Sequence, residues 1–151
     1  MKKFQYSLQT VLDYKEQMLD SVREEYARCQ KQVQDKKLEI EEKKQHRSQI
    51  LREFDEVKIR GAAADVYLMY SAMIDQIDDQ IRFATEELEH LEKKAEKKKA
   101  ELVDAKIDVS RFDQLKGRRI VEYNRAEQKE QETFIEEFVS HQNSTKTGVQ
   151  A

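Results

Sequence analysis

Apolar residues recur at alternating spacings of four and three along two stretches of this sequence, and neither stretch contains a proline. The first stretch runs from Leu8 to Val57 and the second from Tyr67 to Phe112. A helix with this period carries one apolar stripe that must be buried against another helix. Because only the short segment 60–64 separates the stretches, the simplest partner for each is the other. The sequence therefore predicts an all-α fold, a long antiparallel two-helix coiled-coil hairpin.

Local signals place the ends of the expected helices. Gly61 can take the left-handed conformation that ends a helix, and Asp65 is a good N-cap for the helix that follows. We expect helix one over about residues 4–59, with a start near Phe4 or Ser7, the tip over 60–64, helix two over about 65–140 and a flexible tail over 141–151, in one domain spanning 1–151. Such a hairpin should be monomeric alone. The alternative is a continuous helix through Gly61 that forms parallel homodimers, a structural coiled coil with no tip.

Charge and hydropathy exclude several classes of protein. Charged residues make up 39% of the 151 residues, well above the usual quarter, while the formal net charge is only -3. This near balance argues against a nucleic-acid partner, which would favour a clear basic excess. The chain has no run of about 18 apolar residues and no signal peptide, so we expect no direct membrane insertion and a cytoplasmic location.

The two stripes differ in quality. Three basic residues, Lys36, Lys43 and Arg47, occupy seam positions near the middle of the first stripe. Long basic side chains can lay their stems across a seam, but they lower its stability, so we expect a locally loose seam there. Only Lys98 interrupts the second stripe. The single cysteine, Cys29, falls on a seam position and is expected to be a small buried apolar residue.

No motif for catalysis, a cofactor or a metal is present in the sequence. Three glycines cannot build a phosphate-binding loop. His46, His90 and His141 lie far apart and lack a histidine or acidic partner at ligand spacing. The sequence therefore predicts a protein that is not an enzyme and that has no cofactor and no metal.

Two apolar groups fall outside the seam. A hairpin folded about residues 61–64 places Leu8 opposite roughly residues 116–118, so helix two overhangs helix one by about 20 residues, or roughly 30 Å. The overhang ends in an apolar cluster. Either this cluster binds a partner protein, or it folds back on Phe4 and Tyr6. Its members are Phe134, Ile135, Phe138 and Val139. Just after the tip, Leu68, Met69 and Met73 are surplus to a two-helix seam, and they form a binding surface or cap the hairpin.

Three segments, taken in order, resemble the family of the flagellar export protein FliJ. The first is the opening segment 4–16. The second is the segment 66–81 after the tip, with its Tyr-x-x-x-Ile-x-x-Ile-x-x-x-Ile spacing. The third is the segment 111–138, with its Glu-Gln-Lys-Glu run and final Phe cluster. Together they span nearly the whole chain.

This resemblance implies a function. FliJ-like proteins are antiparallel coiled coils that act as the stalk of the hexameric flagellar export ATPase of a type III secretion system. They also contact the membrane-embedded export-gate protein and export chaperones. The resemblance thus implies a location on the cytoplasmic face of the inner membrane, with peripheral association at the flagellar base.

The resemblance also assigns residues to two partners. Contact with the ATPase ring would fall to the open end of the hairpin: Phe4, Leu8, Leu12, Phe112, Leu115, Ile120, Tyr123, Phe134 and Phe138. Contact with the export gate would fall to residues after the tip: Met73, Ile77, Gln80 and Ala84. On helix one, Lys43, His46 and Ile50 give no clear match to the family's gate surface.

Overall fold

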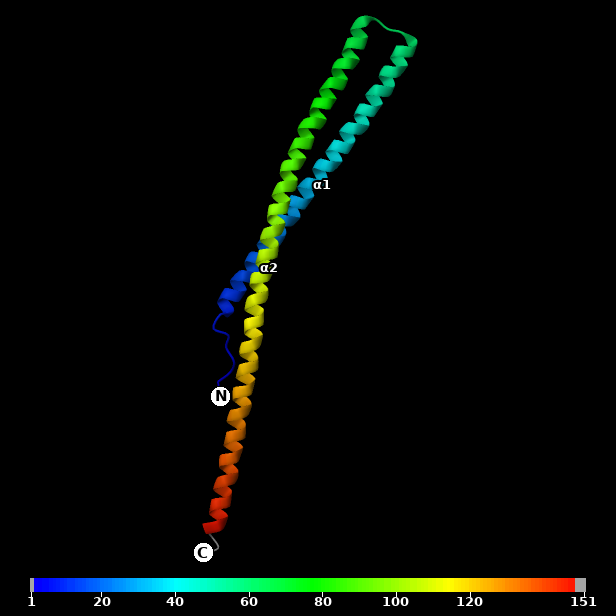
Figure 1. The fold of residues 1–151 in the computed structure, drawn as a ribbon. Helices are drawn as coiled ribbons and strands as arrows, with labels where there is room; N and C mark the ends of the chain where they lie inside the picture. The colour runs from blue at the N-terminus through cyan, green and yellow to red at the C-terminus, as the bar shows by residue number, and fades with distance from the viewer. Residues whose placement is uncertain (1, 149–151) are drawn as a thin grey trace. The chain divides into compact units, whose positions relative to one another are not determined.

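The computed structural model describes residues 2–148, and these form two helices joined by a short connection (Figure 1). Helix α1 spans Gln9–Arg60 and helix α2 spans Ala64–Gly148. No strand occurs within residues 2–148. The chain divides into two compact units: unit 1 combines the described residues of Met1–Leu19 and Ala105–Ala151, and unit 2 is Asp20–Asp104.

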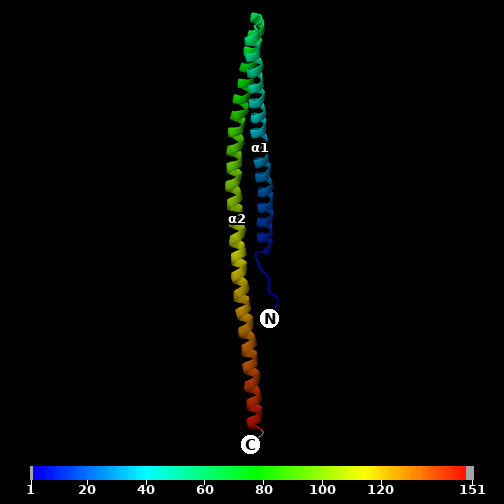
Figure 2. The same cartoon turned by 90° about the vertical axis from the view of Figure 1, so that its right-hand side faces the viewer.

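Unit 2 is an antiparallel helical hairpin (Figures 1 and 2). Lys36 Nζ lies 2.6 Å from Glu87 Oε2, and Lys98 Nζ lies 2.8 Å from Glu25 Oε2. Lys36 follows Glu25 by eleven positions, and Lys98 follows Glu87 by eleven positions. Between these pairs the helices therefore run in opposite directions without a slip in register. The predicted all-α hairpin is confirmed, and the alternative of a continuous helix is wrong.

The turn of the hairpin depends on Gly61. Its φ of 78° lies in the left-handed region that only glycine enters without strain, and its amide still donates to the Val57 carbonyl at 2.9 Å. Helix α2 begins at Ala64, one residue before the expected start, so Asp65 lies in the first turn rather than at the N-cap. A carboxylate in the first turn still interacts favourably with the positive end of the helix dipole. The Tyr67 hydroxyl accepts a hydrogen bond from the Ala62 amide at 3.3 Å.

The core of unit 2 is a single apolar seam. Its buried residues come from both helices and include the expected Cys29: Cys29, Val33, Ile40, Ile50, Ile77 and Ala84. Near the tip, the Phe54 ring stacks on Tyr70 with centroids 5.3 Å apart. A seam of this kind buries one stripe of each helix and leaves the remaining faces exposed, as the heptad pattern predicts.

The basic residues of the seam are not loosely placed. Lys36 pairs with Glu87 on the other helix and with Glu39 on its own, and Lys43 donates to Gln80 at 3.3 Å. Arg47 donates from Nε and Nη2 to the two carboxylate oxygens of Asp78, a bidentate arrangement. The predicted loose seam is wrong, because acidic and amide groups of α2 flank the seam where these side chains emerge.

Lys98 joins the two helices in the same way. Its Nζ donates to Glu25 at 2.8 Å and to Glu101 at 2.9 Å. The hydrogen bond to Glu25, followed by that to Glu101, raises the pKa of Lys98 above its ordinary value. In return, the hydrogen bond from Lys98 lowers the pKa of Glu25, and that from Lys36 lowers the pKa of Glu39. The charged form of each carboxyl group is therefore favoured by folding.

Acidification is expected to weaken unit 2. A carboxyl group whose pKa is lower in the folded chain than its ordinary value of 4.5 stabilises the fold at pH values above 4.5. This stabilisation is lost as the pH falls through the pKa of the folded chain. The melting temperature should therefore hold near neutral pH and fall below about pH 4.5, which circular dichroism can follow. Lys98→Met removes the donor to Glu25 and should reduce this acid-dependent fall. An unchanged acid dependence in Lys98→Met would contradict the prediction.

In unit 1, the N-terminal segment packs against α2 without forming a helix. Residues 2–6 have no regular secondary structure and α1 begins at Gln9, so a helix start near Phe4 is wrong and a start near Ser7 lies closer to the observed one. The Phe4 ring meets Tyr123 edge-on at 5.5 Å, and the Tyr6 hydroxyl donates to the Phe112 carbonyl at 3.1 Å. An extended residue advances about 3.3 Å against 1.5 Å in a helix, so this conformation carries Phe4 farther along α2 than a helix would.

Helix α2 also continues beyond its expected end near residue 140, to Gly148. The hydroxyls of Thr145 and Thr147 donate to carbonyls four residues earlier, at 3.0 and 2.9 Å. These bonds add to the helical turns in a segment that its polar composition predicts to be a flexible tail. Residues 149–151 of that predicted tail lie outside the described residues.

Candidate partner-binding surfaces

The structure divides the residues expected to meet the ATPase ring into two groups. Six of them pack inside unit 1 and are buried or half-buried: Phe4, Leu8, Leu12, Phe112, Leu115 and Tyr123. Leu12 is only 2% exposed, and the Tyr123 hydroxyl donates to the Lys2 carbonyl at 2.6 Å. These six side chains join the N-terminal part of the chain to α2, so their first role is to hold unit 1 together.

The other three residues of this set are exposed on α2. Ile120 is 36% exposed, Phe134 69% and Phe138 56%. With Ile135 and Val139, the two phenylalanines form a C-terminal apolar cluster, defined as Phe134, Ile135, Phe138 and Val139. In both views no other part of unit 1 lies beside this orange and red part of α2 (Figures 1 and 2). The alternative in which the cluster folds back on Phe4 and Tyr6 is therefore wrong.

The residues expected to meet the export gate are also divided. Ile77 and Ala84 are 5% and 1% exposed and lie in the seam against α1. Met73 is half-buried, and Gln80 is exposed and accepts the hydrogen bond from Lys43. Of the four, Gln80 and part of Met73 are therefore accessible to a partner.

Several exposed apolar side chains in unit 2 do not belong to the expected set. Ile59 is 86% exposed, Leu68 71% and Met69 52%, and we call these three the tip patch. The alternative in which Leu68 and Met69 cap the hairpin is wrong. Phe83 is 62% exposed and is missed by the sequence analysis. The heptad pattern does indicate this exposure, because Phe83 directly precedes the seam residue Ala84 and so lies off the apolar stripe.

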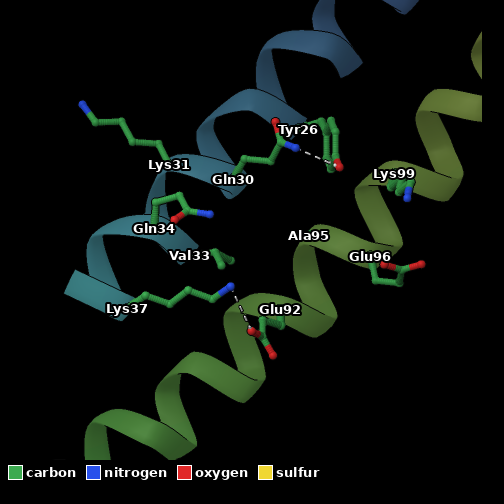
Figure 3. Close-up of a pocket in the computed structure, with 10 residues that line it drawn as sticks. All are labelled: Tyr26, Gln30, Lys31, Val33, Gln34, Lys37, Glu92, Ala95, Glu96 and Lys99. Atoms are coloured by element: carbon green, nitrogen blue, oxygen red, sulfur yellow. Dashed lines mark hydrogen bonds and ion pairs between the residues drawn. The ribbon is translucent and has the colours of Figure 1, made fainter. Parts of the chain in front are cut away.

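A polar groove runs between α1 and α2 of unit 2 (Figure 3). It forms where the short side chains of Val33 and Ala95 leave space between the helices. The Nζ of Lys37 lies 3.9 Å from Glu92 Oε1 across it. The lining carries three lysines and two glutamates and holds no paired nucleophile and base, so it has the character of a solvated surface rather than of an active centre.

The described residues offer no other chemical site. Within residues 2–148, no three histidine, cysteine or acidic side chains gather closely enough to hold a metal ion. Over the same range, neither helix contains a stretch apolar enough to cross a membrane. The features able to bind a partner are therefore surfaces: the C-terminal apolar cluster on unit 1, and the tip patch and Phe83 on unit 2.

Comparison with known proteins gives one match. The model of a protein family described as the flagellar FliJ protein matches residues 4–148. No curated protein and no solved structure matches the chain. The family match covers nearly the whole chain, including both helices and every candidate surface described above.

Proposed function

Because this chain belongs to the FliJ family of flagellar export components, we propose that it serves as the coiled-coil stalk of the hexameric export ATPase. In this role it links the ATPase to the membrane export-gate protein and to export chaperones. It performs no catalysis itself, and it works at the cytoplasmic face of the inner membrane at the flagellar base. Its contribution is mechanical, through contacts that differ between nucleotide states of the ATPase subunits.

The C-terminal apolar cluster is the observation that carries this proposal. Its four side chains are 48–69% exposed on the C-terminal part of α2, which has no neighbour within unit 1. Burying one such aromatic side chain in a partner contributes about 1.5–3 kcal/mol. A single helix without a neighbour can be surrounded on all sides, which suits the central opening of a ring.

The experiment mixes the chain with its cognate export ATPase and measures ring assembly and ATP hydrolysis. The wild-type chain should raise both, and Phe134→Ala combined with Phe138→Ala should abolish most of the increase. Phe83→Ala is a matched control, because Phe83 has similar exposure but lies in unit 2. If the wild-type chain changes neither ring assembly nor hydrolysis, the stalk function is wrong.

The same double variant separates a stalk from an escort that only carries export chaperones. As a stalk with a separate chaperone surface, the variant loses stimulation of the ATPase and keeps chaperone binding. If the protein is an escort, the variant either loses chaperone binding or keeps chaperone binding with no loss of ATPase stimulation. The tip patch, with Gln80 and Phe83, is the surface of unit 2 that we assign to the gate, because Ile77 and Ala84 are buried.

A further inference from the structure

Four aromatic residues of unit 1 lie on one face of α2. Phe112, Tyr123 and Phe134 are spaced eleven residues apart, which is close to three helical turns of about 3.6 residues each. Phe138 follows Phe134 by four residues, about one further turn. This aromatic face, defined by these four side chains, extends the C-terminal apolar cluster toward Phe112. The N-terminal residues 2–6, which we call the strap, lie on the half of the aromatic face that is nearer Phe112.

Side-chain contacts hold the strap on this half of the aromatic face. The Phe4 ring meets Tyr123 edge-on with the centroids 5.5 Å apart, and the Tyr123 hydroxyl donates to the Lys2 carbonyl at 2.6 Å. The Tyr6 hydroxyl donates to the Phe112 carbonyl at 3.1 Å. Tyr123 is half-buried beside the strap, whereas the other half of the aromatic face carries the exposed side chains of the C-terminal apolar cluster.

A strap held in this way is easily displaced. In the part of the chain that the structure describes, no backbone–backbone hydrogen bond joins the strap to α2. Lys2, Lys3 and Gln5 are exposed, and a hollow remains between the strap and α2 beside Arg119 and Ala126. Each ordered residue of the strap also loses conformational entropy, which opposes the few contacts that it makes. The closed and open positions of the strap are therefore close in free energy.

We propose that the strap is an autoinhibitory contact, which masks the Phe112 half of the aromatic face until the ATPase ring displaces it. The inference rests on the proposed stalk function. The ring meets the exposed half first and then extends its contact along the same face of α2. The strap itself shows what the masked half accepts, since an aromatic ring packs on Tyr123 and a carbonyl oxygen accepts from its hydroxyl. The displacing segment of the ring therefore brings an aromatic side chain and a free backbone carbonyl to Tyr123.

Autoinhibition reverses the sign of the effect expected from Phe4. A closed strap divides the affinity for the ring by the fraction of molecules in which the strap is open. If the strap is closed in about nine molecules of ten, its release lowers the apparent Kd by up to about tenfold. Loss of the Phe4 ring therefore strengthens binding, whereas a Phe4 that contacted the ring itself would weaken binding when truncated.

The test measures the Kd of the full-length chain for its cognate export ATPase by titration calorimetry. Phe4→Ala should lower the Kd by about three- to tenfold, because the strap opens. Tyr6→Phe removes only the donor to the Phe112 carbonyl and should lower the Kd by less. Gln5→Ala is the matched control, since Gln5 lies in the strap between these residues but is exposed, and its Kd should equal that of the wild type. Circular dichroism should show all three variants as helical as the wild type.

Hydroxyl-radical labelling of the wild-type chain gives a second readout. When the ATPase binds, labelling of Phe4 should rise because the strap leaves α2, and labelling of Tyr123 should fall because the ring covers it. The inference is overturned, with the stalk function intact, if the wild type binds and Phe4→Ala binds equally or more weakly, or if binding protects Phe4. If neither the wild type nor Phe4→Ala binds the ATPase, the stalk function is wrong and the inference falls with it.

Discussion

Replacing Leu12 with alanine is expected to lower the free energy of unfolding of unit 1 by about 2–5 kcal/mol. Leu12 is 2% exposed and is the largest fully buried side chain among the described residues. Its removal costs the transfer free energy of the lost methyl groups and leaves a cavity that two helical segments cannot easily close. Urea denaturation followed by circular dichroism, with hydrogen exchange of the first turns of α1, measures the loss.

Val11→Ala is the matched control for Leu12→Ala. Val11 precedes Leu12 on the same helix but is 37% exposed, so its truncation removes fewer buried contacts. The free energy of unfolding should fall by less than about 1 kcal/mol. Equal losses in the two variants would show that Leu12 does not anchor unit 1.

The second large effect is expected from Ala84→Leu. Ala84 is 1% exposed in the seam of unit 2, so a larger side chain has to push α1 and α2 apart. Overpacking of this kind costs about 1–3 kcal/mol, and a thermal melt should show the loss of stability. The sequence analysis instead assigns Ala84 to the export-gate contact. A residue that contacted only the gate could be enlarged without any change in the unfolding of the free chain.

Thr85→Leu is the control for Ala84→Leu. Thr85 is the next residue along α2, is exposed, and donates only to the Ile81 carbonyl of its own helix. Its replacement should leave the melting temperature of unit 2 nearly unchanged. If Ala84→Leu is equally harmless, Ala84 is not a core residue and the gate assignment regains its support.

Most of the fold was predictable because the heptad spacing is a local property. The positions of Ile77 and Ala84 on the stripe already indicate burial, and Gly61 already marks the turn. The errors arise where a residue depends on the opposite helix. The spacing shows that Lys36 and Arg47 interrupt a stripe, but it does not show that Glu87 and Asp78 flank them.

The candidate surfaces were predictable only in part for the same reason. Phe134 and Phe138 are expected either to meet a partner or to fold back on Phe4 and Tyr6, and the structure leaves them exposed. Phe4 and Tyr123 were placed in the same binding set, but they contact each other in unit 1. The sequence pattern around an aromatic residue near a chain end is the same whether that residue binds a partner protein or packs on its own chain.

The sequence by itself determined that this chain forms two helices, where they turn, and which stripe of each is apolar, because these depend on spacing along one helix. The tertiary structure decided which apolar residues remain uncovered. The N-terminal segment is extended and carries Phe4 onto Tyr123, so that part of α2 is covered, while the C-terminal apolar cluster is not. Coverage depends on which segment lies opposite, and the period of a single helix carries no information about its partner.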